Sequence, residues 1–92
     1  MNRIYRALSD PTRRQILALL RQKNMTAGEL ATHFDITKPS LSRHFSVLLE
    51  AELIQAEKAG TSIIYHLNIS VLEESLLALL ELFNLKEKHH ED

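Results

Sequence analysis

The fold is decided by residues 25–48, MTAGELATHFDITKPSLSRHFSVL, in which two short helical patterns are separated by a tight turn. Thr26 and Glu29 have the T-x-x-E spacing of a capping box, which predicts the start of the first helix. Asp35 interrupts that helix, and we expect it to adopt a positive φ in the turn, because aspartate tolerates this conformation better than most residues. Thr37 can cap the second helix. Two helices joined in this way predict a helix-turn-helix, whose second helix enters the DNA major groove.

The second helix of this unit has one apolar and one polar face. Leu41, Phe45 and Leu48 recur at helical spacing and form the stripe that we expect to face the core. The opposite face presents small polar and basic side chains, and residues 37–48 include no acidic residue. An ordinary helical hairpin in an all-α core is the alternative, but it does not require such a face. The pattern therefore favours DNA contacts by Thr37, Lys38, Pro39, Ser40, Ser42, Arg43 and His44.

Composition bounds the class of protein. Ninety-two residues, 45% of them hydrophobic, suit one domain that spans residues 1–92. The absence of cysteine excludes disulfides, thiolate metal sites and thiol catalysis. No apolar run reaches the roughly 18 residues that a membrane span needs, so we expect a soluble cytoplasmic protein without membrane insertion.

The formal net charge of −1 is not the basic balance that is typical of DNA-binding proteins. Its distribution is uneven, however. Residues 1–67 carry nine Lys and Arg against six Asp and Glu, a net of +3, and residues 68–92 carry two against six, a net of −4. A mildly basic body can meet phosphates while the acidic segment faces away, although random scatter can also produce differences of this size.

Two helices are predicted before the helix-turn-helix. Residues 2–8 form a short helix, and Asp10 followed by Pro11 is a strong start signal for a second helix that runs to about Arg21. Apolar side chains at helical spacing are expected to face the core: Ile4, Tyr5, Leu8, Ile16, Leu17, Leu19 and Leu20. Basic side chains are expected to stay at the surface as solvated charges: Arg13, Arg14 and Arg21.

A β-hairpin is predicted after the helix-turn-helix. Residues 53–57 and 62–67 have strand character, and residues 58–61 supply turn chemistry. A hairpin behind a recognition helix is the arrangement of a winged helix, so the predicted fold is mainly α with a small β-hairpin. In this interpretation Lys58 and Thr61 at the tip approach DNA. The alternative is a covering flap without a ligand, since the tip carries one lysine.

A last helix is predicted from the segment VLEESLLALLELFNL, with Ser70 as its cap and Glu73 and Glu74 in its first turn. The segment has too many apolar residues for one amphipathic stripe, and a small domain cannot cover them all. Burial against a partner helix is favoured over central burial in the monomer. We predict a homodimer with an interface formed by Ile4, Tyr5, Leu8, Leu72, Leu76, Leu79, Leu80 and Phe83. The chain divides into a helix-turn-helix at residues 26–50, a wing at 53–67 and a dimerisation helix at 71–86.

Residues 7–20, ALSDPTRRQILALL, resemble the opening signature of the ArsR-type winged-helix repressors. Residues 26–31 and 36–44 resemble the helix-turn-helix of that family, and residues 48–54 and 60–67 resemble its helix end and wing. Within the family the sequence is most similar to the SdpR-like branch of metal-free autorepressors. The resemblance implies a homodimeric bacterial repressor that binds double-stranded operator DNA at an imperfect inverted repeat.

The metal sensors of that family use residues that this chain lacks. Their arsenic and cadmium sites need cysteines in the first motif helix, where this chain has Leu-Ala-Thr-His at residues 30–33. Their zinc and nickel sites use histidines along the last helix, where this chain offers glutamates and no histidine before His89. Carboxylates alone do not make a tetrahedral zinc site, so no metal or other cofactor is expected. His89 and His90 could chelate weakly, but a polar chain terminus is the simpler interpretation.

An enzymatic function has little support. The chain has no glycine-rich phosphate loop and no acid–base pair at a suitable spacing. Ser42 and His44 lie too close along one helix to face each other. His44 also lies about 60° from Leu41 around the helix, so a partly buried structural role competes with a phosphate contact.

A different class of function remains open, in which the last helix docks a heterologous protein. Such a docking module does not need the acid-free segment at residues 37–48. The signal that relieves repression also stays open, with a sequestering or anti-repressor protein, a small ligand and protein abundance as the alternatives.

Overall fold

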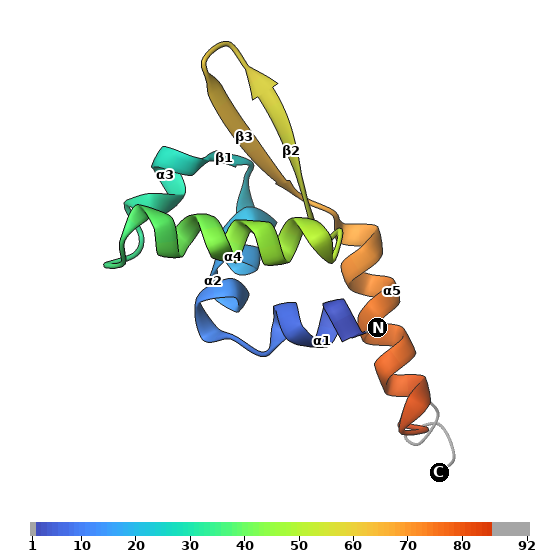
Figure 1. Ribbon diagram of the computed structural model, residues 1–92. Helices are drawn as coiled ribbons and strands as arrows, with labels where there is room; N and C mark the ends of the chain where they lie inside the picture. The colour runs from blue at the N-terminus through green and yellow to red at the C-terminus, as the bar shows by residue number, and fades with distance from the viewer. Residues whose placement is uncertain (1, 86–92) are drawn as a thin grey trace.

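The computed structural model describes residues 2–85 (Figure 1). Within that range the chain forms five helices and a three-stranded antiparallel sheet. In chain order the elements are α1 (Asn2–Leu8), α2 (Pro11–Gln22), β1 (Met25–Thr26), α3 (Ala27–Ala31), α4 (Lys38–Glu50), β2 (Ile54–Ala59), β3 (Ser62–Leu67) and α5 (Ile69–Leu82). This is the predicted winged helix-turn-helix, with one strand more than predicted.

Local signals in the sequence account for the starts of α2, α3 and α4. Asp10 caps α2 through its side chain, and Pro11 occupies the first turn. Thr26 and Glu29 form the predicted capping box at the start of α3, with both reciprocal hydrogen bonds present. Thr37 caps α4 through its side chain. Each of these side chains satisfies a backbone N–H that has no partner within its helix.

The turn between α3 and α4 differs from the prediction. Asp35 does not adopt a positive φ, and the described non-glycine residues that do so lie after α4 and after α5. Instead, α3 ends by tightening: the N–H groups of Thr32, His33 and Phe34 each donate to the carbonyl three residues earlier. Because these bonds close short turns of right-handed helix, the chain leaves α3 without a left-handed residue.

The core lies between the first four helices and the sheet. The predicted stripe of α4 is confirmed, since Leu41, Phe45 and Leu48 are all buried. The rings of Phe45 and Tyr65 lie 4.5 Å apart between centroids and join α4 to β3. In α1 Ala7 is buried, whereas Tyr5 is 38% exposed, so the predicted inward orientation of Tyr5 is wrong within one chain. The buried apolar side chains are Ala7, Ile16, Leu17, Leu20, Met25, Leu30, Leu41, Phe45, Val47, Leu48, Ala51, Leu53, Ile54 and Tyr65.

The sheet has the order β1-β3-β2, so the strand added to the hairpin pairs with β3. Met25 in β1 lies opposite Tyr65. A two-residue strand was not predicted, because it is too short to show the alternation that marks a strand. β2 and β3 pair along six residues each; β3 has its predicted bounds, but β2 runs to Ala59, so the hairpin turns at Gly60 and Thr61 rather than over residues 58–61. Gly60 has a φ of 62°, which suits this tight turn.

The start of α5 differs from the prediction. Asn68 is the cap, and its side chain accepts a hydrogen bond from the Val71 backbone N–H at 3.5 Å. Ser70 therefore lies inside the helix, and Glu73 and Glu74 lie beyond its first turn. The helix ends at Leu82, and the predicted end at residue 86 lies outside the described residues. Figure 1 shows α5 projecting away from the body with its C-terminal half.

Candidate nucleic-acid interface

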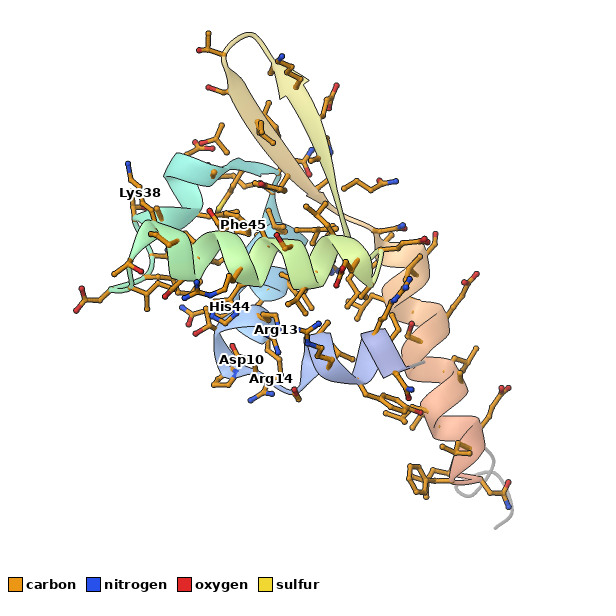
Figure 2. The ribbon with its side chains drawn as sticks, in the orientation of Figure 1. Asp10, Arg13, Arg14, Lys38, His44 and Phe45 are labelled. Carbon is orange, nitrogen blue, oxygen red and sulfur yellow. The ribbon has the colours of Figure 1, made fainter. Side chains whose placement is uncertain are left out.

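The N-terminal half of α4 presents the predicted polar surface. Thr37, Lys38, Pro39, Ser42 and Arg43 are exposed, and Ser40 is half-buried. Figure 2 shows Lys38 projecting from the start of the helix. The Arg43 guanidinium donates to Ser40 Oγ at 3.4 Å, one turn earlier on the same helix. Exposed hydroxyls and guanidinium groups on one helix face are suited to base edges and phosphates in a major groove.

The acidic charge of α4 lies at the opposite end of the helix. Glu50 is twelve residues beyond Lys38, or about 18 Å at 1.5 Å per residue. Its carboxylate lies 3.8 Å from Arg6 of α1, with both side chains about two-thirds exposed. Such an exposed ion pair adds little stability. The first part of α4 is therefore the part that can approach a polyanion.

Two hollows connect the start of α4 to the wing. One, of about 210 Å³, lies between α3 and α4 and is lined by Gly28, Lys38 and Ser42 among others. The other, of about 340 Å³, lies between the start of α3 and the wing and is lined by Gly28 and Thr61 among others. Gly28 lines both hollows, so three of the predicted contacts, Lys38, Ser42 and Thr61, border two adjacent hollows.

The wing itself carries few groups that could bind DNA. Lys58 is exposed and lies opposite Ile63, which is 45% exposed. On the other face of the hairpin, His66 Nε2 lies 2.8 Å from a Glu57 carboxylate oxygen. Figure 1 shows the hairpin of β2 and β3 projecting beyond α3 and α4.

Arg13 does not stay at the surface as predicted. It is partly buried, and its Nε donates to the Ala7 carbonyl at 3.0 Å while Nη2 donates to the Arg6 carbonyl at 2.6 Å. Its Nη1 lies 3.1 Å from His44 Nδ1 on α4. The exposed Arg14 donates to the Leu8 carbonyl at 2.8 Å. Both arginines therefore donate to carbonyls in the last turn of α1, where the Arg6 carbonyl also accepts from the backbone N–H and the hydroxyl of Ser9.

His44 is correspondingly less available to DNA than predicted. Its side chain is 20% exposed and faces Arg13 and Asp10 (Figure 2). Burial alone would raise the pKa of Asp10, but the Arg13 backbone N–H, the His44 ring when it is protonated, the positive charge of Arg13 and the Thr12 backbone N–H together lower it. Sequence reasoning missed this cluster because His44 is 31 positions from Arg13, and no local spacing signals a contact over that separation.

The C-terminal half of α5 leaves large apolar side chains in solvent. Of the predicted interface residues, Leu76 is 44% exposed, Leu80 43%, Phe83 63% and Tyr5 38%. Others are partly used within the chain: Ile4, Leu8 and Leu72 pack against the core, and Leu79 is half-buried. Further exposed apolar residues at this end were not assigned to the interface from the sequence: Leu77, Leu82 and Leu85. We call Tyr5, Leu76, Leu77, Leu80, Leu82 and Phe83 the α5 patch.

Metal-ligating side chains do not gather in groups of three or more within residues 2–85. His89 and His90 lie outside the described residues. None of the helices in the described part of the chain has the length and apolar character to cross a membrane.

Comparison with known proteins decides the family. Residues 10–56 match the model of the bacterial regulatory proteins of the arsR family. The chain belongs to the ArsR family. It is 48% identical over 84 residues to the transcriptional repressor SdpR of Bacillus subtilis, an alignment that covers 91% of this chain and 93% of that protein. The resemblance to the ArsR family is thus confirmed, and with it the prediction of a regulator rather than an enzyme.

Two further ArsR-family relatives extend the comparison. The arsenical resistance operon repressor of Staphylococcus xylosus is 37% identical over 73 residues, which covers 79% of this chain and 70% of that protein. A solved structure of an ArsR-like transcriptional regulator from Rhodococcus sp. RHA1 has a TM-score of 0.79 and 26% identity, and covers 97% of this chain and 83% of that one. The winged helix-turn-helix is therefore shared with solved members of the family.

Proposed function

We propose that this ArsR-family protein is a cytoplasmic transcriptional repressor that binds an inverted-repeat operator as a homodimer, without a metal cofactor. The observation that carries this proposal is the exposed, acid-free start of α4, mounted on the core by Leu41, Phe45 and Leu48. The similarity to a protein named as a transcriptional repressor supports repression as the outcome. The resemblance to autorepressors suggests that the operator controls the protein's own gene.

The side chains of α4 have separate roles in this proposal. Arg43 is exposed at the centre of the polar face, and arginine can donate two hydrogen bonds to guanine. Lys38 at the helix start binds a phosphate, which positions the helix without reading sequence. Ser40 and Ser42 serve either purpose, with Thr37 and Pro39 alongside them. Lys58 and Thr61 contact the DNA backbone from the wing.

The α5 patch forms the dimer interface in this proposal. Exposed leucines on successive turns of one helix are suited to packing against a second copy, with a gain of about 25 cal/mol per Å² of apolar area removed from water. Tyr5 of α1 belongs to the same interface in this proposal, together with the half-buried Ile4, Leu8, Leu72 and Leu79. A dimer axis then presents two copies of α4 to successive major grooves about 34 Å apart.

The metal-free part of the proposal rests on the ligands available. The chain has no cysteine, so a thiolate site for arsenic or cadmium cannot form. The histidines of the described part of the chain are dispersed, and His66 and His44 already contact other side chains. We expect operator affinity to be the same within twofold to threefold in micromolar zinc and in chelator, whereas a tenfold shift would contradict this part and direct attention to His89 and His90.

A protein-docking module is the second candidate, because the exposed α5 patch could equally bind a heterologous protein. A sequestering or anti-repressor protein that relieves repression would use such a surface as well. The two functions differ in α4, since docking through α5 does not require the recognition helix to bind DNA.

Selection from random duplexes tests the proposed function. The purified protein should enrich one motif with twofold symmetry and half-sites about 10 base pairs apart. A docking module without DNA-reading function would enrich no motif. Enrichment of an asymmetric motif would keep DNA binding and contradict the dimer geometry.

A further inference from the structure

Arg13 connects three elements of the fold through one planar group. Its backbone N–H donates to Asp10 Oδ2 at 3.1 Å, which anchors the residue at the start of α2. Two guanidinium nitrogens donate to carbonyls of α1, and the third faces His44 of α4. A guanidinium holds its donors in a fixed fork, so these three acceptors cannot move independently while all three bonds persist.

The bond to His44 fixes which ring nitrogen carries the proton. A guanidinium has no acceptor, so Nδ1 of His44 must accept from Arg13 Nη1 at 3.1 Å. The neutral imidazole then carries its hydrogen on Nε2. His44 directly follows Arg43, the side chain that we assign to base reading. The hydrogen bond therefore acts on the flank of α4 next to its polar face.

The orientation of α4 needs such a directional contact. The hydrophobic burial of Leu41, Phe45 and Leu48 is non-directional, so a hydrogen bond adds a directional restraint on rotation about the helix axis. At the surface radius of about 5.5 Å, a rotation of about 20° moves a side-chain group by about 2 Å. A shift of that size breaks a hydrogen bond to a base edge.

We propose that Arg13 is a positioning residue for DNA reading, which holds the recognition helix α4 in one orientation relative to α1 through His44. Because the proposed function places α1 at the dimer interface, the same contact couples the dimer to the orientation of its recognition helices. The inference rests on that proposed function. It predicts that loss of the contact lowers discrimination between DNA sequences more than it lowers attraction to DNA as a polyanion.

Arg14 provides a matched control. It is the next residue, carries the same charge and donates to the carbonyl of Leu8 at the end of the same helix α1. This hydrogen bond stays within α1 and α2 and does not reach α4. Arg13→Lys and Arg14→Lys therefore both keep the charge and both weaken the end of α1, but only the first removes the fork that reaches His44.

The experiment compares two duplexes: the one bound most tightly after in vitro selection with the parent protein, and its base-scrambled version. The dissociation constants of both are measured by fluorescence anisotropy at one salt concentration, together with the thermal midpoint of each variant. We expect Arg13→Lys to lower the ratio of the two affinities about tenfold. Binding to the scrambled duplex should change little, since phosphate contacts dominate it. Arg14→Lys should keep the parent ratio.

Two variants of His44 decide the result if Arg13→Lys fails to fold. His44→Asn places an amide oxygen near the position of Nδ1 and keeps an acceptor, so it should hold the ratio within about twofold of the parent. His44→Leu removes the acceptor and should lower the ratio about tenfold. Equal affinity ratios in His44→Asn and His44→Leu would overturn this inference and leave the proposed function standing. An equal fall of the affinity ratio in Arg13→Lys and Arg14→Lys would do the same. If the parent selects no duplex, the proposed function fails and this inference falls with it.

Discussion

The helices α4 and α5 have 13 and 14 residues, and they differ in how far the chain covers their apolar side chains. In α4 the apolar stripe is covered by the chain's own core, with Leu48 at 0% exposure. In α5 Leu76 and Leu80 stay 44% and 43% exposed, although the helix is the more apolar of the two. A helix that is apolar around most of its circumference is stable only when other elements cover it. One chain therefore covers the apolar stripe of α4, whereas in the proposed homodimer a second copy covers α5.

The largest effect is expected from charges placed in the α5 patch. Replacing Leu76 and Leu80 together by Glu should yield monomers or unfolded chain, because each buried charge costs several kcal/mol. Sedimentation equilibrium at micromolar concentration measures the mass. Ile36→Glu is the control, since Ile36 is 41% exposed but lies outside α5. A parent protein that sediments as a stable, folded monomer would contradict the proposal that a second copy covers α5.

A smaller effect is expected when single leucines are shortened. Leu48→Ala should lower the free energy of unfolding by about 2–5 kcal/mol at any protein concentration, because it leaves a cavity inside one chain. Leu80→Ala should destabilise the dimer, so its effect should diminish as the protein is diluted. Denaturant titrations over a hundredfold range of concentration separate the two. Equal concentration dependence of both variants would contradict the assignment of α5 to the interface.

These helices also show which features could be predicted from the sequence. The capping box at Thr26 and the Asp10–Pro11 start are complete within four residues, and both are present as predicted. The cap of α5 was misplaced because Asn68 and Ser70 are both good caps, and the choice depends on where β3 ends. Local chemistry therefore predicts that a helix exists more reliably than it predicts the first residue.

Contacts between residues that are far apart in the sequence limit how much of the site can be predicted. The polar face of α4 follows from spacing alone, and Lys38 and Arg43 are exposed as predicted. Arg13 was predicted to be a solvated charge, because its partners on α1 and α4 are brought to it only by the packing of three helices. The half-burial of His44 was one of two alternatives that helical geometry left open.

An effect of about 1–3 kcal/mol is expected at the centre of the recognition surface. Arg43→Ala should weaken operator binding by this amount and relax specificity at one position in each half-site. Lys38→Ala should weaken binding to all sequences and lower the salt dependence by about one counterion for each contact removed. Affinities for the selected duplex and its single-base variants, measured at several salt concentrations, check both. If both variants bind as the parent does, α4 is not the recognition helix.

The smallest effect is expected at the cap of α2. Asp10→Ala should lower the free energy of unfolding by about 1 kcal/mol near neutral pH. Because the pKa of Asp10 is lowered from 3.8 in the folded protein, its contribution is present in full above that value and is lost as the pH falls through the lower folded-state pKa. Asp10→Asn keeps a cap without the charge, so the parent should lose stability relative to this variant in acid. A difference between parent and Asp10→Asn that does not change with pH would contradict the ionic contribution.

In the proposed function, two chains read one operator through their two copies of α4. Sedimentation equilibrium of the protein with its selected duplex, and with a duplex carrying 5 extra base pairs between the half-sites, tests it most directly. We expect two chains bound to each duplex of the first kind. The insertion, about half a helical turn, places the half-sites on opposite faces of the DNA and should abolish paired binding. One chain per duplex, or paired binding that survives the insertion, would contradict the account.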